Sequence, residues 1–200
     1  YPLKKRLLAE ARFMRGLYYF YLAFHFNRPI LLEEPAYDLY VEYTNAENEE
    51  VWTFIEDDLK YAIEHLPEKS EYSSSELGRA TKGAAKSLLG KSYLYQEKWD
   101  LAEATFLEVM NSGEYALSMP KGTDSTDYVY AYLANFSFMD IPGENGTYEA
   151  EHNIESIFEI NNSDNTENVI NVWNPGLQSD GTDFTAWFGA TGFKNVVPKA

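Results

Sequence analysis

Two tryptophans near the carboxyl end, with short polar residues around them, have the side chains best suited to bind a ligand. Flat aromatic rings stack on the weakly apolar faces of sugars, while amides and carboxylates hydrogen-bond to the hydroxyl groups. The sequence therefore predicts a carbohydrate-binding site made of Trp173, Trp187, Phe188, Asn171, Asn174, Gln178, Asp180 and Asp183. The alternative interpretation is that both tryptophans anchor loops to the rest of the fold.

Catalytic residue types are present but form no recognisable motif. The 32 acids include pairs such as Asp57 and Asp58 by abundance alone, whereas glycoside hydrolysis needs two carboxylates opposed across a cleft. His25, His65 and His152 lack the spacing of zinc ligands, and His25 is predicted to be a packed residue of the first helix. No nucleophile elbow or phosphate loop occurs, and the absence of cysteine excludes thiol chemistry. No enzymatic activity is predicted.

Oxygen ligands for a structural calcium ion are available at Asp124, Asp127, Asp140 and Asp164. They do not follow the spacing of an EF-hand loop. The sequence therefore predicts no cofactor, and calcium stays open as a weakly supported alternative.

The charge of the chain excludes several classes of partner. Sixteen basic residues stand against 32 acidic ones, a formal net charge of −16. Such a chain is repelled by phosphate backbones and anionic headgroups, so neither nucleic acid nor a membrane surface is an expected partner. No apolar stretch is long enough to span a bilayer.

The amino-terminal half has strong helical periodicity. A first helix is predicted from about Leu3 to Phe26, with two apolar faces, so we expect it to lie inside a bundle. One face contains Leu3, Leu7, Ala11, Met14, Tyr18 and Leu22, and the other contains Phe13, Leu17, Phe20 and Phe24. Most of the aromatic run 18–21 is assigned to packing.

Three more helices are predicted. One begins within 44–50, capped by Thr44 or Asn45, and ends at Pro67. The others cover about 81–96 and 99–110. Trp52 and Trp99, at helix starts, are predicted to be core residues.

Beyond Gly113 the helical periodicity fades. Most of 120–150 and 174–200 is predicted to be loop, with short strands at 156–160 and 169–173. We therefore expect a mainly α fold in which a helical scaffold (1–119) supports a loop-rich ligand-binding part (120–200) of the same domain.

The third and fourth helices carry most of the tetratricopeptide pattern, namely Leu89, Gly90, Tyr93, Ala102 and Phe106. The small Gly90 and Ala102 would let two antiparallel helices approach closely. The pattern departs from the consensus at Lys86, where tryptophan is usual, and at Glu114, where proline is usual. An ordinary helical hairpin is the alternative.

Three blocks of the sequence, 9–32, 78–117 and 155–160, resemble the SusD/RagB family in order and character. The resemblance implies a surface-exposed outer-membrane lipoprotein of Bacteroidetes. Such proteins capture glycans, or sometimes peptides, and form a lid over a SusC-type TonB-dependent transporter. It also implies tetratricopeptide-like helical pairs beneath a loop-rich ligand face.

The chain departs from the family pattern at both ends. It has no export signal or lipid-bearing cysteine, and it lacks the family's later arginine-rich block. We therefore expect an internal fragment, in contact with the membrane only through a lipid anchor outside this chain. Two alternative functions stay open, namely a tetratricopeptide-like scaffold for a protein or peptide partner, and a carbohydrate-active enzyme.

Overall fold

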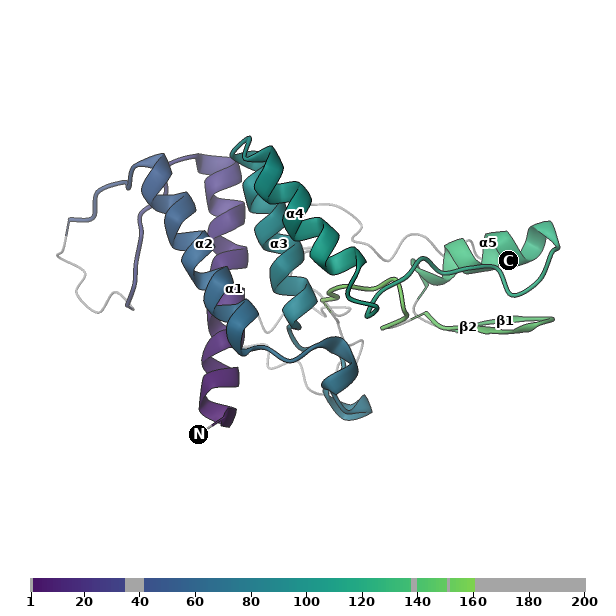
Figure 1. Cartoon of the computed structure of the whole chain (residues 1–200). Helices are drawn as coiled ribbons and strands as arrows, with labels where there is room; N and C mark the ends of the chain where they lie inside the picture. The colour runs from purple at the N-terminus through teal and green to yellow at the C-terminus, as the bar shows by residue number, and fades with distance from the viewer. Residues whose placement is uncertain (1, 35–41, 138–139, 151, 161–200) are drawn as a thin grey trace, which may run out of the picture.

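Four long helices form the body of the protein, in two pairs that lie side by side (Figure 1). The computed structural model describes residues 2–34, 42–137, 140–150 and 152–160. The first pair is α1 (Pro2–Phe26) with α2 (Asn48–His65), and the second is α3 (Lys82–Tyr95) with α4 (Trp99–Met110). Because α2 and α3 also pack together, the four helices share one hydrophobic core.

The long helix α1 has one buried face and one exposed face. Phe13 and Phe20 are buried against the core, whereas Leu3, Tyr18 and Leu22 are exposed. The expectation that α1 lies inside a bundle is therefore wrong for the described part of the chain, because α2 and α3 leave one of its faces uncovered. The aromatic run is divided in the same way, since Tyr19 is buried and Tyr21 is exposed.

The start of α2 lies later than the sequence predicts. Neither Thr44 nor Asn45 caps it; Glu47 is the cap residue, and its backbone N–H donates to the Glu50 carboxylate at 2.9 Å. The reason is that the Ala46 N–H donates to the Pro29 carbonyl at 3.1 Å, which holds the preceding segment extended along the end of α1. Trp52 lies in the core, as predicted.

The pair α3–α4 is built around a close helix contact. A Cβ atom at Gly90 would lie 2.8 Å from the ring of Phe106, so only glycine fits without displacing that ring. A short turn joins the helices, with Glu97 in the left-handed region and the Lys98 N–H donating to the Tyr93 carbonyl at 3.0 Å. Trp99 is 59% exposed at the first position of α4, so its predicted place in the core is wrong.

Two short 3-10 turns, η1 (Lys69–Glu71) and η2 (Ser74–Glu76), lie in the α2–α3 connection. The region predicted as loop at 120–150 instead contains α5 (Ser125–Ala134) and an antiparallel hairpin of β1 (Ile141–Gly143) and β2 (Gly146–Tyr148). The sequence pattern does not show these elements because α5 is short and each strand has only three residues, with a glycine at the turn.

The carboxyl-terminal part of the described chain returns to the helices. Segment 156–160 is not a strand, contrary to the prediction, because it pairs with no other strand in the described residues. Ile157 and Phe158 instead pack on the helical core. In Figure 1, α5 and the hairpin lie side by side and extend away from α1–α4. None of the described helices has the length and hydropathy needed to span a membrane.

Candidate functional site

The ligand site predicted from the sequence lies at 171–188, outside the described residues, as does the strand predicted at 169–173. The described chain ends at Ile160, eleven positions before Asn171. The structure therefore describes the helical scaffold and the segment 152–160, which precedes the predicted site in the sequence.

Lys69 holds the segment 152–160 on the scaffold. Its Nζ donates to the carbonyl oxygens of Asn153, at 2.5 Å, and Ser156, at 2.8 Å. Burial lowers the pKa of Lys69, partly opposed by the nearby carboxylates of Glu159 and Glu114. A charged donor on two backbone carbonyls is a strong clamp, because each of these bonds is stronger than one between neutral groups.

A recess lies where this segment meets the α2–α3 connection, lined in part by Lys69, Arg79, His152 and Glu159. Its charges are already engaged. Arg79 Nε donates to Glu10 at 3.0 Å, and the His152 backbone N–H donates to Glu159 at 3.0 Å. These hydrogen bonds join the recess-lining residues to α1 and to each other. The recess therefore has no opposed pair of free carboxylates of the kind that acid–base catalysis needs.

Replacing Lys69 by alanine is expected to loosen the segment 152–160. Two partly buried carbonyl oxygens would lose a charged donor, at a cost of about 1–3 kcal/mol. Amide hydrogen exchange is the measurement, and it should accelerate at Glu155 and Ser156, whose amides donate to Asn153, while the amides of α3 stay protected. Lys4→Ala, at an exposed position, is the control. Equal exchange in both variants would show that Lys69 does not hold the segment.

Three exposed aromatic residues form a row along α5 and just beyond its end. The aromatic row consists of Tyr128, Tyr132 and Phe136, spaced four residues apart. Residues at this spacing share one face of a helix. The rings of Tyr132 and Phe136 have centroids 5.1 Å apart. The predictions from sequence missed this row, because the four-residue spacing alone does not show which face of a helix is exposed.

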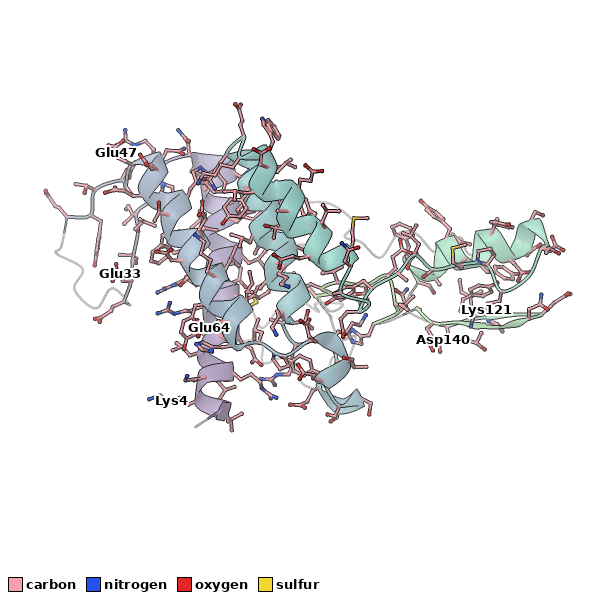
Figure 2. The ribbon with its side chains drawn as sticks, viewed as in Figure 1. Lys4, Glu33, Glu47, Glu64, Lys121 and Asp140 are labelled. Carbon is pink, nitrogen blue, oxygen red and sulfur yellow. The ribbon has the colours of Figure 1, made fainter. Side chains whose placement is uncertain are left out.

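The opposite face of α5 fixes the row in place. Ala131 and Ala134 are buried against Tyr148 of the hairpin. The Tyr148 hydroxyl donates to the buried Asp127 at 2.7 Å and accepts from the Lys121 backbone N–H at 2.8 Å. Figure 2 shows Lys121 and Asp140 on this extension of the molecule.

The acids considered as calcium ligands serve separate structural roles. Asp124 caps α5 by accepting from the Thr126 N–H, Asp127 binds Tyr148, and Asp140 accepts from the Ala150 N–H at 2.9 Å. No cluster of three metal-ligating side chains occurs among the residues described by the structure. Asp164 lies outside them.

Two further residues were considered for catalysis or metal binding in the sequence, and the structure gives each of them another environment. His25 is exposed near the end of α1, so the expectation that it is a packed residue is wrong. Its ring lies 4.8 Å from that of Phe24, which is exposed as well. Asp58 is buried in an ion pair with Arg15 and not available for catalysis.

Comparison with known proteins identifies one family of similar proteins. Residues 3–94 match the model of a SusD-like family described as starch-binding and associating with the outer membrane. A SusD-like protein of Bacteroides ovatus is 30% identical over 175 residues, which cover 86% of this chain and 27% of that protein. The chain is similar to SusD-like proteins in sequence. It spans about a quarter of the length of this relative.

Solved structures of SusD-like proteins have the same fold. A SusD-like protein from Bacteroides fragilis superposes with a TM-score of 0.62 at 30% identity, over 80% of this chain and 28% of that one. A laminarin-binding SusD-like protein gives a TM-score of 0.53 at 36% identity, over 68% of this chain and 27% of that one. Paired helices with a small two-stranded sheet are thus shared with this family, as the sequence predicted for the helices.

Proposed function

We propose that the SusD-like chain belongs to a non-catalytic protein that captures glycans at the cell surface and delivers them to a SusC-type TonB-dependent transporter. The observation that carries the proposal is the 36% identity to a laminarin-binding protein of the same family. The association of the family with the outer membrane supports the location, and we extend it to a surface-exposed lipoprotein anchored outside this chain.

The division of the chain into scaffold and ligand-binding parts remains our interpretation. Residues 1–119 supply the helical core, and 120–200 supply exposed aromatic residues together with the predicted site. In support, the described segment that leads to that site is fixed by Lys69 and by Phe158, whose ring lies 5.0 Å from that of Phe13. A fixed support is needed if stacking rings are to keep their spacing.

A glycan array probed with the whole protein tests the function. Binding to uncharged glucans with no release of shorter products supports capture without catalysis. Release of products, abolished by changing one acid, would instead establish a carbohydrate-active enzyme. Binding to peptides and not to glycans would favour the tetratricopeptide-like scaffold.

Trp173→Ala and Trp187→Ala are each expected to weaken glucan binding about fivefold, since one stacking contact contributes about 1 kcal/mol. Titration calorimetry of the whole protein with laminarin measures the change. Trp99→Ala, an exposed tryptophan on α4, is the matched control. If all three variants bind as tightly as the original protein, the site assignment at 171–188 is wrong.

A further inference from the structure

The turn of the β1–β2 hairpin contains the one asparagine in the sequence that is followed directly by glycine. Asn145 and Gly146 are both exposed, and Gly146 has a φ of 129°, a conformation that favours glycine. Because glycine has no side chain to shield its backbone nitrogen, this nitrogen can reach the side-chain carbonyl carbon of the preceding asparagine. Asn-Gly is for this reason the dipeptide at which asparagine most readily loses its side-chain amide in water.

The reaction needs only groups in the turn and water. The Gly146 backbone nitrogen loses its proton to solvent and attacks Cγ of Asn145, so that a bond forms between these two atoms. The Cγ–Nδ2 bond breaks, ammonia leaves, and a five-membered succinimide ring remains. Water then opens the ring at one of its two carbonyl carbons. One opening gives aspartate, and the other gives isoaspartate, whose main chain runs through the former side chain.

The Asn145 side chain is held more weakly than those of two other asparagines in this part of the molecule. Its Nδ2 donates to Asp127 Oδ2 at 3.3 Å, which is long for a hydrogen bond. By contrast, Asn135 donates to Glu155 at 2.9 Å, and the buried Asn153 donates to Asn135 at 2.7 Å. The Asn145 amide can therefore turn toward the next backbone nitrogen at a lower cost than the other two.

The same amide lies where the hairpin meets α5. Asp127 of α5 is 4% exposed, and its Oδ1 accepts from the Tyr148 hydroxyl at 2.7 Å while its Oδ2 accepts from Asn145. The main chain passes so close at Gly122 that a Cβ atom there would overlap the side chains of both Asp127 and Asn145. A buried carboxylate is costly without such donors, so the contact helps to hold the hairpin on α5.

Deamidation would change this contact in two ways. The new carboxylate removes a donor from Asp127 and places a second negative charge beside it. Isoaspartate also adds one atom to the main chain of a two-residue turn, between the paired Gly143 and Gly146. Lys121, the single lysine or arginine between residues 117 and 160, already donates to the Thr147 carbonyl. Both changes therefore weaken the attachment of the hairpin.

We propose that Asn145 is a site of spontaneous deamidation, with water as the reactant, and that the modification releases the hairpin from α5. This inference goes beyond the proposed function and does not depend on it. The change is confined to the extension formed by α5 and the hairpin. Their small core consists of Ala131, Ala134 and Tyr148, and it is separate from the core of the four long helices.

The test incubates the whole protein at neutral and at mildly alkaline pH and follows the masses of two peptides. Cleavage after glutamate releases 145–149, which contains Asn145, and 109–114, which contains the exposed Asn111 before a serine. Peptide 145–149 is expected to gain the mass difference between NH2 and OH several times faster than peptide 109–114. The gain should be faster at the higher pH, because the attacking nitrogen must first lose its proton.

Asn145→Gln is the matched control, because it keeps an amide but cannot close a five-membered ring. Its peptide should keep its mass during the same incubation. If peptide 145–149 of the original protein gains mass no faster than peptide 109–114, Asn145 is not a deamidation site and the proposal is wrong.

Hydrogen exchange tests the release of the hairpin. The Lys121 amide donates to the Tyr148 hydroxyl at 2.8 Å, so it should exchange faster in the incubated protein than in fresh protein. The amides of α3 should stay unchanged, and incubation of Asn145→Gln should leave the Lys121 amide as it was. A gain of mass in peptide 145–149 without faster exchange at Lys121 would overturn the release of the hairpin.

Discussion

Replacing Phe13 by alanine is expected to lower the free energy of unfolding by about 3–5 kcal/mol, the usual cost of removing a buried phenylalanine. Phe13 is 1% exposed and lies where α1 faces the core. Its ring also meets that of Phe158 edge-on, at a centroid distance of 5.0 Å. The substitution would therefore leave a cavity and remove the packing partner of the segment 152–160.

The measurement is chemical denaturation, with unfolding monitored by circular dichroism. Phe26→Ala is the control on the same helix. Phe26 is exposed, so its loss should change the stability by no more than about 0.5 kcal/mol. Hydrogen exchange adds a second readout, because the amide of Ser156, which donates to Asn153 at 3.0 Å, should exchange faster in the Phe13 variant only. Similar stability losses in the two variants would contradict the buried role of Phe13.

The helices of the body can be predicted from the sequence because their apolar positions recur over many turns. The close contact of Gly90 with Phe106 is predictable as well, since the tetratricopeptide pattern places a small residue opposite a large one at this spacing. Periodicity does not show which neighbour covers an apolar face. This explains why the sequence predicts burial for Leu3 and Leu22 of α1 and for Trp99 of α4, whereas the structure shows all three exposed.

The candidate site is less predictable, for a physical reason. Trp173 and Trp187 are candidates because of their residue type and their neighbours in the sequence. Their role in ligand binding stays a prediction, because they lie outside the described residues. The aromatic row has a regular four-residue spacing, but α1 shows the same spacing at Leu3 and Leu7. Only the packing of Ala131 and the hydrogen bond between Asp127 and Tyr148 decide which face of α5 is exposed.

A salt bridge between the first two helices should have the other large effect on stability. Arg15 donates to Asp58 through two nitrogens, Nε to Oδ2 at 2.6 Å and Nη2 to Oδ1 at 2.8 Å. The Asp58 side chain is only 3% exposed. The bond from Asp58 is the main cause of a raised pKa of Arg15, and the guanidinium also lies over the ring of Phe54.

Arg15→Met is expected to lower the free energy of unfolding by about 3 kcal/mol, because it leaves a buried carboxylate without its partner. Arg12 does not replace it, since its nearest nitrogen is 3.9 Å from Asp58 and its guanidinium lies over Tyr61. Arg28→Met is the control: Arg28 pairs with Glu47, both are exposed, and such pairs contribute about 0–1 kcal/mol.

A double variant separates the unpaired charge from lost packing. With Arg15→Met and Asp58→Leu together, neither member of the buried pair is charged, and apolar replacement of a buried pair is often nearly neutral. Most of the stability lost in Arg15→Met should then return in urea denaturation. If the double variant is less stable than Arg15→Met alone, the pair contributes through its geometry, and the two helices depend on it for their alignment.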